Sequence, residues 1–169
     1  MVDSLIVLYD HDEEAFTSNG LGALPDAASC IVTEERNGEY EVEMEYPLTG
    51  SHFHDIQKRR ILYVKPNPYD EPQPFRIYSI TKPINGIVTV HAAHLSYDTS
   101  GSIVKLFPAD AGSASAAMSY LKNFSVPSTP FTFFTNVGKS GTMSVPKPSS
   151  IRSLLGGSDG SILDTFGGE

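Results

Sequence analysis

Several residue types that would point to a particular chemistry are scarce in this sequence. Its 169 residues include no tryptophan and a single cysteine, Cys30. One cysteine excludes an internal disulfide and a metal site built from thiolates. Cys30 alternates with Val32 and Glu34, which is typical of a strand residue rather than of a reactive thiol. We expect the chain to be made and folded in a cytoplasm.

Positive charge and long apolar runs are also scarce. Lys and Arg total 12 against 20 Asp and Glu, which gives a net charge of −8. This balance argues against general binding to nucleic-acid phosphates, because such binding needs clustered cations. No apolar run approaches the roughly 20 residues of a membrane span, and the start MVDSLIVLYDHDEE does not resemble a signal peptide. The remaining composition is that of a globular protein with one domain, or one domain and a subdomain.

The most informative features that are present are two hairpin patterns, each with an Asn-Gly step at its tip. The first reads CIVTEER-NG-EYEVEMEYP around Asn37 and Gly38, and the second reads FRIYSITKPI-NG-IVTVHAAHLSYD around Asn85 and Gly86. Asn and Gly tolerate the positive φ angles of a type I′ turn, whose twist matches that of the flanking strands. The sequence therefore predicts two hairpins with these residues at the tips.

The first hairpin has a clear period of two, which assigns its faces. One face holds Tyr40, Val42, Met44 and Tyr46, and the other holds Glu39, Glu41, Glu43 and Glu45. We expect the first set to be buried and the glutamates to point away from the core. A two-residue turn would place Ile31 opposite Met44 and Glu34 opposite Glu41. Because like charges across a ladder repel, this acidic face is either well solvated or meets a basic neighbouring subunit.

The second hairpin has apolar residues on both faces. Pairing Ile84 with Ile87 across the turn would place Ile77 opposite His94 and Tyr78 opposite Ala93. Pro83 cannot donate to a ladder, so the outer side of this strand is expected to be a free edge near the turn. A strand pair that is covered on both sides suggests a barrel with another element packed outside it.

The rest of the chain mixes short strands, loops and helices. The expected strands are 5–10, 60–67 and 131–137, and a helical turn is expected at 51–59. The stiff proline-rich segment at 66–74 is either a hairpin loop or an SH3-type ligand. A helix is expected at 109–124, capped by Ser113 or Ser115, with short helices within 150–157 and 159–168, the last capped by Asp159 or Ser161. The predicted fold is α+β and mainly β. It has a small β-barrel at 1–100 with helical insertions and an appendage at 101–169. The chain ends directly after a helix stop, which suggests a truncated second subdomain.

Candidate catalytic groups do not form a convincing set. His91 and His94 are three apart on a strand and so point to opposite faces, where they cannot share a metal ion. His52 and His54, with Asp55 nearby, are a weak candidate for a metal site. The sequence contains no GxSxG or HExxH pattern. We assign no catalytic, cofactor-binding or metal-binding residue.

The hairpins and the C-terminal run together carry a family resemblance. The strings RNGEYEVEMEYPLTG, ILYVKPNPYDEPQPFRIYSITKPINGIVTVHAAHLSYD and PSSIRSLLGGSDGSILDTFGGE resemble the N-terminal region of phage minor structural proteins, the prophage tail endopeptidase or tail-associated lysin family. The resemblance extends over almost the whole chain. The residues that match the family pattern are Tyr40, Tyr46, Pro47, Arg76, Tyr78, His94, Tyr97 and Asp98.

The resemblance implies a function. In that family this region is similar to the baseplate hub of contractile tails and forms a trimeric ring that closes the tail tube and lets DNA leave. It implies a homotrimer in the virion at the tail tip, assembled in the host cytoplasm beside the distal tail ring and the tape-measure protein. DNA would pass through the lumen only transiently, and no cofactor or membrane contact is implied. Lytic activity would lie in a separate C-terminal region. The alternatives are a cell-wall peptidase or metal hydrolase, and a glycan-binding module of a receptor-binding protein.

Overall fold

The computed structural model describes residues 5–36 and 38–168 of the chain. The chain divides into two compact units, residues 1–95 and 96–169, and each unit has its own hydrophobic core. The division falls at the start of the 3-10 helix η2 (Leu95–Gly101). Within the described residues, no helix has both the length and the apolar character that a membrane crossing requires.

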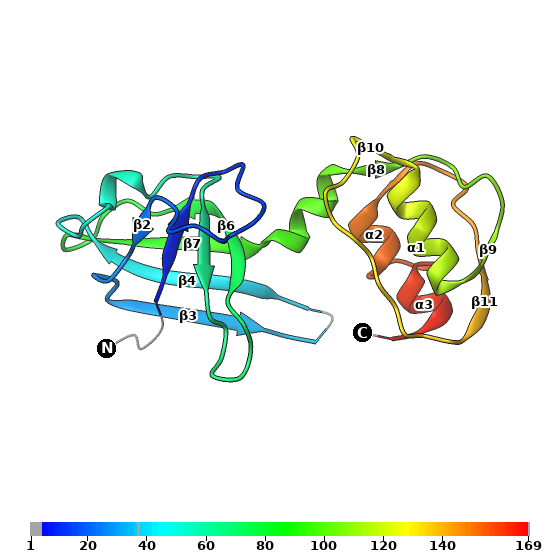
Figure 1. Cartoon of the computed structure of the whole chain (residues 1–169), viewed down its shortest axis with the longest axis horizontal. Coiled ribbons are helices and arrows are strands. Elements are labelled where there is room, and N and C mark those ends of the chain that lie inside the picture. Colours follow the sequence, from blue (N-terminus) through cyan, green and yellow to red (C-terminus); the bar gives the residue numbers. More distant parts are fainter. Residues whose placement is uncertain (1–4, 37, 169) are drawn as a thin grey trace. The chain divides into compact units, whose positions relative to one another are not determined.

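The first unit is built on a seven-stranded antiparallel sheet (Figure 1). The strand order is β2-β1-β5-β6-β7-β4-β3. The strands are β1 (Val7–Tyr9), β2 (Gly22–Ala23), β3 (Ser29–Glu34), β4 (Tyr40–Pro47), β5 (Ile61–Val64), β6 (Gln73–Ile80) and β7 (Ile87–His94). The short 3-10 helix η1 (Phe53–Asp55) forms where the sequence predicts a helical turn.

The sheet curls into a half-barrel and does not close in the described part of the chain (Figure 1). Its two edges are β2 and β3. Closure would require the two edge strands to pair along their length. Because β2 has only two residues and β3 has six, a continuous ladder between them cannot form. The mainly β prediction is confirmed, whereas the barrel is an open one.

Strand β4 contributes one face to the core, as its alternation predicts. Val42, Met44 and Tyr46 are buried, and Tyr40 is half-buried at the end of the strand. The alternate positions carry glutamates that face away from this core. A period of two places successive side chains on opposite faces, so the sequence alone assigns both faces of this strand.

The cross-strand register of the first hairpin differs from the prediction by one residue. Met44 faces Cys30 rather than Ile31, and Glu34 faces Tyr40 rather than Glu41. The backbone N–H of Glu35 donates to the carbonyl of Glu39, so the loop is one residue longer than a two-residue turn. Gly38 N–H donates back to the carbonyl of Glu35, while Asn37 lies outside the described residues. The predicted repulsion across the ladder is therefore absent from this pair.

The second hairpin has a two-residue turn at Asn85 and Gly86, with Ile84 and Ile87 bonded to each other across it. Both turn residues have positive φ angles, 52° and 79°, as a type I′ turn requires. Further from the turn, however, the predicted register is wrong.

The register shifts because β6 contains a β-bulge beside Tyr78. Ile77 faces Ala92 rather than His94, and Phe75 faces His94. A second shift of one residue lies between the turn and Ile80, because continuing the Ile84–Ile87 pairing would place Ile80 opposite His91, whereas it faces Val90. A bulge adds one residue to one strand, so each bulge moves the partner by one position. The pairing that the turn fixes is therefore lost along the strand, and the register shifts between Ile77 and Ser79.

The opposite face of the sheet is covered only in part. Over β1 and β5, the rings of Tyr9, Phe16 and Tyr63 pack together, with Phe16 stacked on Tyr63 at 5.2 Å between centroids. Phe16 comes from the loop between β1 and β2, so this loop covers the sheet there. Apolar packing outside the sheet was predicted for the second hairpin, but it lies over β1 and β5, and Tyr78 of the second hairpin is 49% exposed.

The second unit holds three helices and two small sheets, one ordered β10-β8-β12 and the other β11-β9. The elements are β8 (Ile103–Val104), β9 (Ala111–Ser113), α1 (Ala114–Asn123), β10 (Ser125–Val126), β11 (Ser140–Met143), β12 (Ser149–Ser150), α2 (Ile151–Leu155) and α3 (Ile162–Phe166). Its core gathers the inward faces of α1, α2 and α3.

Hydroxyl caps set the helix starts in this unit. The side chain of Ser113 accepts a hydrogen bond from the N–H of Ala116, which selects Ser113 over Ser115 as the cap of α1. Ser161 accepts from the N–H of Asp164 and so caps α3, in place of Asp159. Helix α3 ends at Gly167, whose φ of 76° suits glycine.

The predicted strand at 131–137 is absent, and this prediction is wrong. The strand of this region is β11, in a segment predicted to be a loop. The ammonium of Lys122 donates to the carbonyls of Thr129 and Phe131 at 2.7 Å each. A lysine of α1 thus holds the first carbonyl of this segment, and the β-forming composition of 131–137 is overridden by tertiary contacts.

Candidate functional site

The family-pattern residues Tyr40 and His94 meet inside the first unit. Their rings stack with centroids 4.6 Å apart, and Phe75 packs edge-on against both at 5.1 and 5.5 Å. Burial lowers the pKa of His94 to about 4, because the charged form loses its hydration. Burial also raises the pKa of Tyr40 to about 12, with the carboxylates of Glu34 and Asp70 adding to the effect. Both groups are neutral near pH 7, so this cluster is a packing unit.

Tyr46 and Pro47 organise the end of β4. The hydroxyl of Tyr46 donates to the carbonyl of Ser51, and the backbone N–H and hydroxyl of Ser51 both bond to Oδ2 of Asp26. These hydrogen bonds, with the Ser51 hydroxyl as the largest contribution, lower the pKa of Asp26. Pro47 faces Ile87 in the last pair of the ladder. The cluster links the segments that precede β3 and follow β4.

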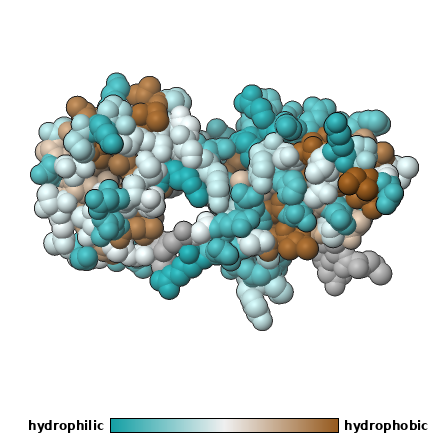
Figure 2. Space-filling model, turned by 180° about the vertical axis from the view of Figure 1, so that it is seen from behind, coloured by the Kyte–Doolittle hydropathy of each residue, from teal (hydrophilic) through white to brown (hydrophobic). Residues whose placement is uncertain are grey.

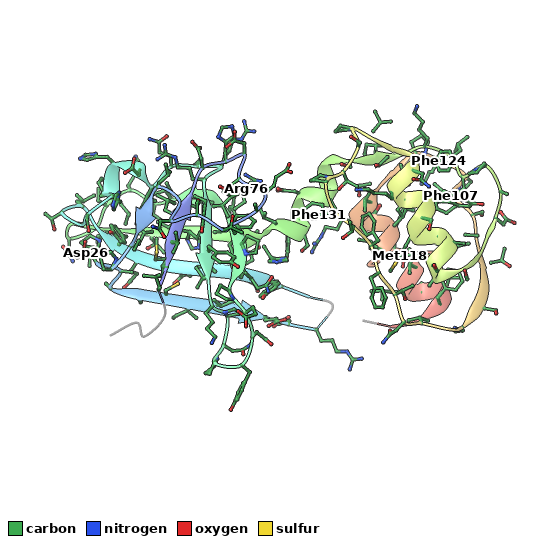
Figure 3. The ribbon with its side chains drawn as sticks, in the orientation of Figure 1. Asp26, Arg76, Phe107, Met118, Phe124 and Phe131 are labelled. Atoms are coloured by element: carbon green, nitrogen blue, oxygen red, sulfur yellow. The ribbon has the colours of Figure 1, made fainter. Side chains whose placement is uncertain are left out.

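Arg76 links two loops through their backbones. It lies on β6 and extends toward the loop after β1 (Figure 3). Its Nη1 donates to the carbonyl of His11 at 2.9 Å and to the carbonyl of Arg59 at 2.7 Å. This family-pattern residue therefore fixes the position of the residue 57–60 segment relative to the sheet.

The exposed half of the sheet presents a polar surface, which we call the outer face and which comprises Ile31, Glu41, Glu43, Glu45, Tyr78 and His91. The Tyr78 hydroxyl donates to Oε2 of Glu41 at 2.7 Å, and Nδ1 of His91 lies 3.7 Å from Oε2 of Glu43. The rings of Tyr78 and His91 stack at 6.2 Å. These contacts orient two acidic side chains, those of Glu41 and Glu43.

The outer face also exposes apolar surface. Ile31 is 59% exposed and Tyr78 is 49% exposed. Ile31 lies on β3, and no strand of the described chain pairs with the outer side of β3. On the face seen in Figure 2, hydrophobic atoms reach the surface in small patches among hydrophilic ones. The outer face thus combines an acidic row with one exposed isoleucine beside it.

A second charged feature of the first unit, the cationic corner, comprises the exposed side chains of Lys58 and Arg59. They line a cavity of about 180 Å³ together with Gln57, Arg60 and the Asp10–His11 pair. Arg60 is engaged by Asp55 at 3.3 Å and by Asp10 at 3.9 Å. In the described residues, no hydrogen bond or ion pair engages the side chains of Lys58 and Arg59.

The remaining family-pattern residues lie in the second unit. The guanidinium carbon of Arg152 stands 3.6 Å from the centre of the Tyr97 ring, a cation–π contact that joins η2 to α2. Asp98 is exposed in η2. The family-pattern residues are thus spread over several packing clusters, and they do not converge on one site.

A groove of about 400 Å³ runs along α1 in the second unit. It is lined by α1 side chains, Met118 among them, and by residues 132–135. Beside it, Tyr120 packs edge-on against Phe107 and Phe124 at 5.0 and 5.7 Å (Figure 3). Because Lys122 on the groove wall is already bonded to two carbonyls, the groove offers no spare cation.

The candidate metal ligands do not gather. Nδ1 of His52 lies 3.1 Å from Oδ2 of Asp55, while the ring of His54 packs against the ring of Phe53. Among the described residues, the only group with metal-like spacing is the exposed cluster of Asp10, His11 and Asp12. The first two of these already bond each other at 2.9 Å. His91 and His94 point to opposite faces of β7, as predicted.

Comparison with known proteins gives one informative result. No family model and no curated protein matches the sequence. The crystal structure of prophage tail protein gp18 from Listeria monocytogenes EGD-e matches with a TM-score of 0.69 at 13% sequence identity, over 96% of this chain and 46% of that chain. This chain has the fold of a prophage tail protein. It spans just under half the length of that neighbour.

Two features of the surface were missed by sequence reasoning. A two-residue turn would place Ile31 opposite Met44 and hence on the core face, whereas the longer loop places it opposite Glu43 on the outer face. The outward position of Ile31 is predicted if Arg36-Asn37-Gly38 is taken as a three-residue loop, which this sequence also suits. The cationic corner has a local signal, the consecutive basic residues Lys58, Arg59 and Arg60.

Proposed function

We propose that this chain is a structural component of a phage or prophage tail. The observation that carries the proposal is the agreement of fold with the Listeria prophage tail protein over 96% of the chain. Such an extensive agreement includes both compact units and not only a common sheet. The family resemblance of the sequence points the same way independently of the structure.

Within the tail, we infer a baseplate-hub-like role. The chain would form a homotrimeric ring at the tail tip that closes the tube, beside the distal tail ring and the tape-measure protein. The open half-barrel and the exposed outer face support this role, because both leave surface for neighbouring subunits. A net charge of −8 would also let DNA pass through a ring without adhering to it.

The role proposed for this segment is structural and not enzymatic. The residues of the family pattern pack in separate clusters, and none of them stands with a nucleophile or metal-ligand set. Any lytic activity would belong to another region of a longer protein. A peptidoglycan-release assay tests this point directly, since cleavage by this chain alone would contradict it.

Deletion of the gene followed by electron microscopy tests the tail assignment. We expect tailless particles or tails without a closed tip, and complementation by the intact gene. Normal infectious particles from the deletion strain would contradict the proposal. Light scattering on the intact protein tests the ring, for which we expect the mass of a trimer, and a stable monomer or dimer would overturn the hub role.

A further inference from the structure

We propose that neighbouring copies of this chain associate head to tail, with the outer face of one copy docked on the cationic corner of the next. The inference rests on the proposed ring and specifies the two surfaces that would form it. Both surfaces belong to the first unit, so their relation within one copy follows from a single sheet.

The two surfaces are complementary in charge. The outer face presents Glu43 and Glu45 on an exposed strand, with Glu43 58% exposed. The cationic corner presents Lys58 and Arg59, which have no partner within the described chain, above a cavity of about 180 Å³. A cavity of that size accepts a carboxylate side chain, and a guanidinium beside it can bind that carboxylate through two hydrogen bonds.

The apolar part of the outer face has a role in the same contact. Ile31 lies directly beside Glu43, because the two residues face each other in the β3–β4 ladder. Lys and Arg carry long apolar stems below their charged ends, and such stems cover exposed aliphatic side chains. The corner can thus satisfy the glutamates and bury Ile31 together, which a small ion or a solvated surface would not do.

The two surfaces lie at the same height along the strands but at different strands of the sheet. The N–H of Arg59 donates to the carbonyl of Ile77, Ile77 faces Ala92, and Ala92 faces Val42, which lies between Glu41 and Glu43. The corner precedes β5 and the acidic row lies on β4, three strands away in the order β5-β6-β7-β4. Three strand spacings correspond to about 14 Å.

Because the two patches are different, their pairing defines the type of contact between copies. Two different patches on one copy, each suited to the other patch on a neighbour, make a heterologous contact. Heterologous contacts generate a ring when the rotation closes, whereas a two-fold dimer can pair the face of each copy with the corner of the other and stops at two copies. Face-to-face contact of two acidic outer faces, or of two cationic corners, is repulsive. The charges therefore exclude contacts between like patches, and the proposed trimeric ring, which a reciprocal dimer cannot form, selects the head-to-tail arrangement.

Charge reversal tests the inference in the intact protein, with light scattering and sedimentation as the measurements. Glu43→Lys with Glu45→Lys, or Lys58→Glu with Arg59→Glu, each weakens association at least about tenfold. The quadruple variant restores it, because the charges are exchanged and still complementary. The two double variants, mixed, bind each other although neither binds itself. Asp110→Lys with Asp159→Lys, and Lys139→Glu with Lys147→Glu, are exposed controls with matched charge changes that leave association unchanged.

The outcomes separate the inference from the proposed function. If the intact wild-type protein forms trimers and the double variants do so equally well, the docking surfaces are wrong and the ring stands. Equal loss in the control variants would also overturn the docking surfaces. If the intact protein is monomeric at every concentration, the ring and the docking both fail. Circular dichroism and the thermal unfolding midpoint show whether each variant retains its fold.

Discussion

The imidazole of His94 stacks on the ring of Tyr40 across the sheet, with centroids 4.6 Å apart and 28° between the ring planes. This pair lies where β7 ends and β4 begins, so it fastens one end of the curled sheet. Both residues belong to the family pattern that the sequence suggests. Both side chains are uncharged near neutral pH and contribute to stability by packing. Protonation of His94 would place a charge in this buried stack, so the pair is sensitive to acid.

Acid is expected to destabilise the first unit through His94. Its pKa is lowered from 6.5 to about 4 by burial, so the unfolded chain takes up the proton more readily than the folded one. The stability that depends on this group is complete above about pH 6.5 and is lost as the pH falls toward 4. We expect a loss of roughly 1–2 kcal/mol, reduced by the partial exposure of the ring.

Urea unfolding at a series of pH values checks this prediction. His94→Phe keeps an aromatic ring in the stack and removes the proton site, so the pH dependence between 6.5 and 4 flattens. His54→Gln alters an exposed histidine and leaves the dependence as in the wild type. An unchanged slope in His94→Phe would show that other groups cause the acid sensitivity.

Cys30 is expected to react slowly with thiol reagents. Burial raises the pKa of its thiol from 9.0 to about 11, so the thiolate is rarer than in a free thiol. At mildly alkaline pH the reaction with an aromatic disulfide should be about a hundredfold slower than that of a small thiol. Concentrated urea should abolish the difference. Fast labelling of the folded protein would mean that the edge strand β3 opens readily.

Gly50→Ala is expected to destabilise the first unit. A Cβ at this position would stand 2.5 Å from Cε1 of the buried Tyr46 ring. Tyr46 is held by its bond to Ser51 and cannot move away freely, so we expect a loss of about 1–3 kcal/mol in thermal or urea unfolding. Gly112→Ala is the matched control, because an added Cβ there meets nothing within 4 Å. Equal effects of both substitutions would contradict the close packing at Tyr46.

The irregular segment of the second unit gives a prediction that uses neighbouring phenylalanines. Phe133 packs against the core of that unit, whereas Phe134 is 87% exposed. Phe133→Ala should lower the unfolding free energy by about 1–2 kcal/mol, less than for a fully buried phenylalanine. Phe134→Ala should change it by less than about 0.5 kcal/mol. A strand at 131–137 with Phe134 facing the core would reverse this order, and thermal unfolding of both variants distinguishes the two.

The local features of this protein were readable from its residues. The alternation in β4 assigned Val42 and Met44 to the core, because a strand places successive side chains on opposite faces. Asn85 and Gly86 adopt the positive φ angles that a tight turn requires, and Ser113 caps α1 through a hydrogen bond from Ala116, three residues away. Each of these depends on neighbours within a few residues, and so the sequence alone carries the information.

Only the tertiary structure decided the pairings and the surfaces. A bulge at Tyr78 and a longer loop near Gly38 moved the registers, and the shift in β3 turned Ile31 from the core face to the outer face. Residues 131–137 have the composition of a strand, yet they form none, and Lys122 from α1 bonds the carbonyls of Thr129 and Phe131 at the start of this segment. The outer face and the cationic corner come from segments that are far apart in sequence. Their relation exists only once the strand order is set, because that order depends on long-range packing that no local pattern specifies.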